Sequence, residues 1–292
     1  MSKKLIKGYI FIILSAVIFG TMPLMAKHIY ASGANSLTLV LLRNLLSLPA
    51  MALLATAGGK SLKINPKALP SLALTGLMGS CITPILLFSS YNFMPSGAAT
   101  VFHFIYPAAV FIAEFIFLKK KLKLGNLLSL VLCIIGVCMF YAPGQKITPT
   151  GSALALLSGI TYAIYVVLLS EFRYKEITGF LFGFYLALTN SIVMLVVLVA
   201  SNQLMLPGTL TGWILAFVFA IIVNVCAVIL FQKGTFLTGG TRASILSTFE
   251  PVTSVVVGVL FLGEVVGVST IAGTILVILS SILIAIFDMK KE

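Results

Sequence analysis

The most unusual side chain in this sequence is Glu250, an acid inside a long apolar run. Within residues 240–262 the only other charge is Arg242, near the start. At the helical rise, Glu250 lies roughly 15 Å from the ends of this membrane-length segment. A carboxylate at that depth should face protein or a water-filled cavity. Pro251 removes a backbone donor at the same level, and Ser247 lies one turn earlier, so we predict a functional centre here.

A second deep charge, Arg43, lies about eight residues inside the second apolar stretch, too deep to reach water comfortably. Its planar guanidinium should meet a carboxylate, either that of Glu250 or that of a substrate. Glu250 itself could be a structural acid paired with Arg43, or it could bind a cationic substrate group or a coupled proton. Proton coupling would depend on which partner faces this acid.

The fourth apolar stretch carries its own polar face. His103 lies one turn before Tyr106 and Pro107. We interpret His103 and Tyr106 as cavity-lining residues and Pro107, like Pro251, as a hinge; a hydrogen-bonded core histidine is the alternative. Glu114 returns to the same helical face near lysines 119–121. It is expected to act mainly as a gate or interface ion pair, with a direct role in transport as the alternative.

Other polar side chains could complete a pocket, although each could equally be ordinary packing. Tyr162 and Asn224 would place polar tips on apolar walls. The sequence contains no P-loop, HExxH or GxSxG motif, so neither ATP hydrolysis nor another enzymatic activity is expected. The cysteines Cys81, Cys133, Cys138 and Cys226 lie in apolar segments without CxxC spacing. We expect no metal and no cofactor.

The composition indicates that the lipid bilayer is the solvent. Of the 292 residues, 60% are hydrophobic and 9% are charged. The apolar runs are continuous rather than alternating, which excludes a membrane barrel. The net charge of +12 lies mostly in short loops, so nucleic acid is not an expected partner. The sequence predicts an all-α integral membrane protein of ten transmembrane helices, at about 8–29, 35–56, 68–91, 96–118, 124–142, 150–170, 177–200, 209–231, 240–262 and 266–287.

Lysine and arginine lie mainly on one side of this predicted topology. If the N-terminus is cytoplasmic, the cytoplasmic loops hold most of them, and Lys146 is the loop lysine on the other side. The excess of positive charge on the cytoplasmic side predicts a multi-pass protein of the plasma membrane with both termini in the cytoplasm.

A weak internal repeat divides the chain. A shift of 144 residues places Pro107 on Pro251 and aligns the fifth predicted span with the tenth. We predict two five-helix units, residues 1–143 and residues 149–288. Because each unit has an odd number of spans, the second must be inverted relative to the first, as in many transporters.

With these features the chain resembles the EamA-type carriers of the drug/metabolite transporter superfamily. The resemblance covers nearly the full length. It rests on the duplicated five-helix pattern and on Arg43, Tyr106-Pro107, Phe249-Glu250-Pro251-Val252, Leu262-Gly263-Glu264 and Gly273. Phe19-Gly20 and Tyr162-Ala163 stand where the family often has tryptophan before a small residue. Lys120 stands where the first repeat often has the acid that matches Glu264.

The resemblance implies a transporter and leaves its substrate open. We expect a secondary active transporter that moves a small polar or zwitterionic metabolite, such as an amino acid or related amine, by alternating access. Export of another class, such as a sugar, nucleoside or organic cation, is the alternative; an intramembrane enzyme and a channel are remoter ones. The expected partners are this substrate and the lipid bilayer, while a coupled proton and a homodimer stay open.

Overall fold

The structure is a computed structural model that describes residues 3–57, 61–94, 96–120, 124–139, 148–172, 177, 179–262 and 267–289. These residues are helical or lie in turns and short connections, with no strand among them. The all-helical prediction is therefore confirmed for this part of the chain. The Gly263-Glu264 motif and Lys146 lie outside the described residues.

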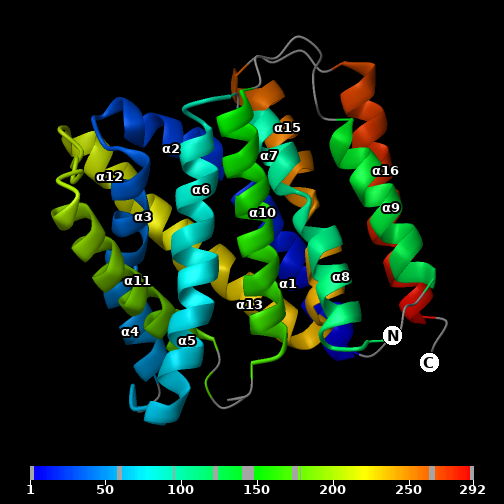
Figure 1. The fold of residues 1–292 in the computed structure, drawn as a ribbon, viewed down its shortest axis with the longest axis horizontal. Helices are drawn as coiled ribbons and strands as arrows, with labels where there is room; N and C mark the ends of the chain where they lie inside the picture. The colour runs from blue at the N-terminus through cyan, green and yellow to red at the C-terminus, as the bar shows by residue number, and fades with distance from the viewer. Residues whose placement is uncertain are drawn as a thin grey trace.

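The helices of the first half are α1 (Lys3–Phe19), α2 (Met22–Ala31), α3 (Ser36–Leu45), α4 (Leu48–Thr56), the 3₁₀ turn η1 (Pro66–Ala68), α5 (Leu69–Gly76), the π-helix η2 (Leu77–Ile82), α6 (Thr83–Ser90), α7 (Ser96–His103), α8 (Tyr106–Ile116) and α9 (Leu124–Cys138). Those of the second half are α10 (Pro149–Ser170), α11 (Phe180–Ala200), α12 (Leu210–Phe219), the π-helix η3 (Ala220–Val228), α13 (Ile229–Thr238), α14 (Gly240–Leu246), α15 (Phe249–Leu262) and α16 (Val268–Met289). Figure 1 shows that α1 begins and α16 ends at the same end of the bundle, which we call the terminal end.

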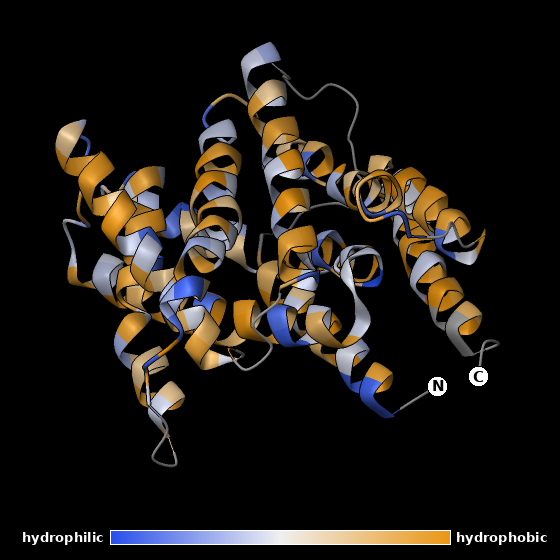
Figure 2. Ribbon diagram, turned by 60° about the horizontal axis from the view of Figure 1, so that its bottom comes forward, coloured by the Kyte–Doolittle hydropathy of each residue, from blue (hydrophilic) through white to orange (hydrophobic). Residues whose placement is uncertain are grey.

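Seven helical stretches within the described residues are long and apolar enough to cross a membrane, and two apolar helices are shorter. The seven correspond to predicted spans one to four and six to eight, whereas the ninth predicted span is divided between α14 and α15. Figure 2 shows most of the visible helical ribbon in the hydrophobic colour. Many large apolar side chains stay exposed, for example Phe117 at 78% and Leu210 at 77%. Such exposure is expected where lipid is the solvent.

Proline explains why most of these stretches are broken. Helices α2, α4, α6 and α8 each begin one residue before a proline, at Pro23, Pro49, Pro84 and Pro107. Proline lacks the N–H that an unbroken helix needs and fits the first turn of a new one. In the ninth span the new helix α15 begins two residues before Pro251. The breaks are thus encoded locally.

The two π-helices support the internal repeat. A shift of 144 residues moves η2 (Leu77–Ile82) onto residues 221–226, which lie inside η3 (Ala220–Val228). π-helical segments are rare and occur frequently at functional sites. Their equivalent positions indicate that the two halves share one local design.

The most extensive packing runs between the two halves of the chain. Helix α1 packs on α13, α6 on α10, α3 on α11, α8 on α14, and α9 on α16. The first span of one half packs on the third span of the other half in both directions. The first predicted span contacts the eighth, and the sixth predicted span contacts the third. Figure 1 shows α9 beside α16 at one edge of the bundle.

The α9–α16 contact depends on two glycines. A Cβ atom at Gly136 would lie 2.9 Å from the carbonyl oxygen of Gly273, and one at Gly273 would lie 2.6 Å from that of Gly136. Backbone atoms cannot move away without shifting a whole helix. The pair therefore sets how closely α9 and α16 approach.

We predict that Gly136→Ala destabilises the protein by about 1–3 kcal/mol, the usual range for overpacking. A fall in the apparent melting temperature of the detergent-purified protein would measure this loss. Gly267→Ala is the matched control, because a Cβ atom there meets nothing within 4 Å. Equal melting temperatures for both variants would contradict the proposed close contact.

Candidate functional site

A cavity of about 50 Å³ lies between the two halves, at the level of the helix breaks. Four residues predicted from the sequence line it: Arg43 from α3, His103 from α7, Tyr162 from α10 and Glu250 from α15. We call it the central cavity. Much of its remaining wall is apolar and includes Phe19, Met22, Leu87, Phe88 and Phe231. The fold thus brings together four polar side chains that are far apart in the sequence.

Asn224 holds Arg43 in place. The Arg43 Nε donates to Asn224 Oδ1 at 3.0 Å, and Asn224 Nδ2 donates to the Arg43 carbonyl oxygen at 2.7 Å. Asn224 is not part of the cavity wall, so it holds the guanidinium from behind. The side-chain bond uses only Nε, and among the described residues no hydrogen bond occupies the two terminal nitrogens of Arg43, which lines the cavity.

Two amides, those of Asn224 and Asn44, join the two π-helices to α3. Asn224 in η3 also donates to Asn44 Oδ1 at 3.2 Å, and Asn44 Nδ2 donates to the carbonyl oxygen of Ser80 in η2 at 3.3 Å. The side chains of Arg43, Asn44 and Asn224 belong to residues that are at most 5% exposed. A buried hydrogen-bonded network of this kind fixes the rotamer of the arginine that it surrounds.

Arg43 and Glu250 line one cavity without pairing with each other. Neither of the two ion pairs between described residues involves them. Within the described part of the chain, no side-chain hydrogen bond reaches the Glu250 carboxylate. The cavity therefore carries one positive and one negative group that are both open to a bound molecule.

His103 is oriented by a serine on α10. Its Nδ1 lies 2.8 Å from Ser158 Oγ, whose own hydroxyl donates to the carbonyl oxygen of Ala155 at 2.6 Å. A hydroxyl has a single proton to donate, so Nδ1 is the donor and Nε2 of a neutral ring is an acceptor. Ser158 was not predicted from the sequence. The available signal was its position one helical turn before Tyr162, on the same face of the helix.

Tyr162, in the cavity wall, is the centre of a cluster of aromatic rings. Its ring centroid lies 4.8 Å from that of Tyr106, 5.4 Å from His103, 5.5 Å from Tyr165 and 5.8 Å from Phe231. Tyr106 is 1% exposed and is not part of the cavity wall. Its hydroxyl donates to the carbonyl oxygen of Ser244 on α14 at 3.4 Å. Phe231 could not be predicted as a site residue, because a phenylalanine in an apolar span looks like any other lipid-facing or core residue in the sequence.

The remaining predicted residues lie at the helix breaks or away from the cavity. Ser247 lies in the break between α14 and α15, where its hydroxyl donates to the Ala243 carbonyl oxygen at 2.7 Å. Pro107 and Pro251 lie in the first turns of α8 and α15. Glu114 lies near the terminal end of α8 and belongs to a separate polar cluster.

Metal ligation finds no support within the described residues, where no group of three or more His, Cys, Asp or Glu side chains could hold an ion. The four cysteines are free; Cys81 and Cys133 are buried, while Cys138 and Cys226 are exposed. The central cavity combines one arginine, one acid, one histidine and tyrosines with a largely apolar wall.

Known proteins share both the sequence pattern and the fold of this chain. The chain matches the EamA-like transporter family twice, over residues 6–142 and over residues 149–286. It is 26% identical to an uncharacterized transporter of Clostridium kluyveri, covering 95% of this chain and 92% of that one. It is 25% identical to the uncharacterized inner membrane transporter YicL of Salmonella typhimurium, covering 98% and 97%. A solved crystal structure described only as a protein shares the fold, with a TM-score of 0.79, 14% identity and 98% coverage of both chains.

The two matches cover nearly the whole chain, and each takes in one of the two halves that pack against each other. The family resemblance seen in the sequence is thereby confirmed. This chain is a multi-pass membrane protein that belongs to the EamA-like transporter family.

Proposed function

We propose that this protein is a secondary active transporter of a small polar or zwitterionic metabolite, such as an amino acid or a related amine. One observation carries the proposal: Arg43 and Glu250 line one cavity and leave their charges open among the described residues. Two opposite charges at membrane depth that do not pair are costly unless a ligand or water meets them. A molecule with both a carboxylate and an ammonium group would satisfy both.

Each side chain of the pocket then has a distinct role. Arg43 binds the carboxylate through the two nitrogens that Asn224 leaves open. Glu250 binds the ammonium group or a coupled proton, and the rings of Tyr162 and His103 supply aromatic faces and polar tips. The cavity volume of about 50 Å³ holds only a few water molecules, which favours a compact substrate or an occluded state.

Alternating access would arise from movement of the two halves against each other. In this proposal the ten spans form two inverted five-helix repeats in the plasma membrane, with both termini cytoplasmic. Pro107 and Pro251 are the hinges, since they lie where α8 and α15 restart after a break. The inverted repeat and the midplane site are the features of carriers that move around a fixed binding site.

The charged site should bind ligands that carry a matching charge. Amino acids or amines should raise the apparent melting temperature of the purified protein, by an amount equivalent to about 2.7 kcal/mol at a hundredfold excess over the dissociation constant. Glu250→Gln should lose the response to amines, because its neutral amide no longer offers a negative charge. Sugars and nucleosides are the control ligands; a response to these alone, or an unchanged response of Glu250→Gln, would exclude this site.

A substitution of Asn224 tests the hydrogen bond that this residue makes with Arg43. Asn224→Asp should place a carboxylate against Arg43 Nε and so neutralise the charge offered to a ligand. We expect at least a tenfold loss of affinity for amino acids, or about 1.4 kcal/mol, and little change for amines without a carboxylate. Thermal-shift titration measures both affinities.

Asn190→Asp is the matched control for this variant. Asn190 is also buried, at 0% exposure, and lies on α11 outside the cavity wall. The substitution introduces an acid of the same kind without touching Arg43. If Asn224→Asp binds amino acids as wild type does, Asn224 does not act through Arg43.

A further inference from the structure

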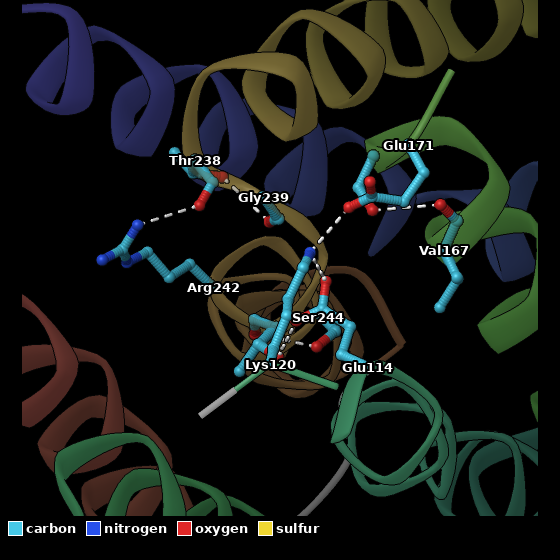
Figure 3. A network of polar contacts seen from close by, with 10 residues as sticks. Glu114, Lys120, Val167, Glu171, Thr238, Gly239, Arg242 and Ser244 are labelled. Atoms are coloured by element: carbon cyan, nitrogen blue, oxygen red, sulfur yellow. Dashed lines mark hydrogen bonds and ion pairs between the residues drawn. The ribbon is translucent and has the colours of Figure 1, made fainter. Parts of the chain in front are cut away.

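The terminal end of the bundle holds a polar network centred on Lys120. Its ammonium nitrogen lies 2.7 Å from Glu171 Oε1 and 3.1 Å from Glu114 Oε1. The other oxygen of Glu114 accepts a hydrogen bond of 2.7 Å from the Thr241 hydroxyl. Figure 3 shows Lys120 between the two acids, in front of α14.

The network connects the two halves of the chain. Glu114 lies on α8 and Lys120 follows that helix, whereas Glu171 directly follows α10 and Thr241 lies on α14. Contact is close here, because a Cβ atom at Gly240 would lie 2.7 Å from Glu114 Oε1. Helices α8 and α14 therefore cannot separate at this end without breaking the hydrogen bond between Thr241 and Glu114.

The backbone before Lys120 is strained in a way that positions the lysine. Lys119 has a φ of +51°, a left-handed conformation that glycine or asparagine usually adopts after a helix. The Lys120 N–H donates to the Glu114 carbonyl oxygen at 3.1 Å, a bond that spans six residues and reverses the chain. A strained residue persists when surrounding contacts hold it, and it often marks a switch region. The turn brings the Lys120 side chain back over Glu114.

The charges in this network suit a reversible contact. Partial burial lowers the pKa of Lys120, but its hydrogen bond to Glu171 and the nearby Glu114 charge outweigh burial and raise it above 10.5. The lysine is therefore charged at neutral pH. Its side chain is 42% exposed and that of Glu171 is 45% exposed, so water can replace their contact at little cost.

The network is partly exposed and lies near the end of α8, whose first residue, Tyr106, belongs to the ring cluster of the central cavity. A second cavity of about 150 Å³ opens here and is lined by Glu114, Lys120, Thr241 and Arg242, among others. One turn further along α14 lies Ser244, which is 0% exposed and whose carbonyl oxygen accepts from Tyr106. A path from this second cavity along α8 and α14 leads to Tyr106, whose ring contacts Tyr162 in the wall of the central cavity.

We propose that Lys120, Glu114, Glu171 and Thr241 form a gate that closes the terminal end of this path. In the closed state described here, one ammonium group holds α8 to the end of α10, and the Thr241 hydroxyl holds α8 to α14. Opening breaks the Lys120 contacts, which frees Glu114 to leave Thr241, and α8 and α14 then separate. The proposal concerns access and does not depend on which substrate the central cavity binds.

Access can be tested with a reporter cysteine. Ser244→Cys is introduced into the full-length protein with its four native cysteines replaced by alanine, and a membrane-impermeant maleimide is added from the terminal side of proteoliposomes. We expect slow labelling of the reporter protein and of its Lys120→Arg variant. Lys120→Met should raise the labelling rate about tenfold, equivalent to about 1.4 kcal/mol in the opening equilibrium.

Lys119→Met is the matched control, because it removes the same charge at the neighbouring position and should leave labelling slow. Glu171→Gln provides a second disruption at a more exposed residue, and its labelling should also rise. The gate is excluded if Glu171→Gln and Lys120→Met both label at the reporter's rate. It is also excluded if Lys119→Met raises the rate as much as Lys120→Met does.

Discussion

Inside a membrane, every backbone polar group that a helix leaves unpaired must find another partner. This constraint explains where the chain breaks its helices. The breaks before Pro23, Pro84 and Pro107, and the one before α15, all lie at the level of the central cavity, where protein and polar side chains replace lipid. The irregular backbone and the charged residues therefore occupy the same layer of the molecule. The site exists where the helices cannot be continuous.

Within that layer, the two π-helices supply the hydrogen bonds that hold Arg43 and its neighbour Asn44. η3 places Asn224 behind Arg43, and η2 offers the Ser80 carbonyl oxygen to Asn44. A buried guanidinium is stable only when hydrogen bonds fix it, and here an uncharged amide does so. A carboxylate in the same place would have neutralised the arginine. The choice of asparagine keeps the charge available to a ligand while its rotamer stays fixed.

The sequence predicted the helical class, most of the spans and the four polar residues that meet in the cavity. It could do so because a charged residue in an apolar run is costly in lipid and must therefore face the interior of the protein. It did not predict that Asn224 lies behind Arg43, because span boundaries do not reveal which way a residue in a π-helix points. The ion pair of Glu114 with Lys120 matches the expected pairing near lysines 119–121. Ser158 and the Thr241 partner of Glu114 were not predicted, because serine and threonine are common and only tertiary packing shows which of them meet a given side chain.

The packing between the halves also has a consequence for biosynthesis. The helices of the first half make their most extensive contacts with the second: α1 with α13, α6 with α10, and α9 with α16. Because the ribosome makes the chain from its N-terminus, these first helices enter the membrane before their partners exist. They gain their native neighbours only after the second half has been synthesised. Until then, lipid or the insertion machinery must cover the surfaces that later form the interface.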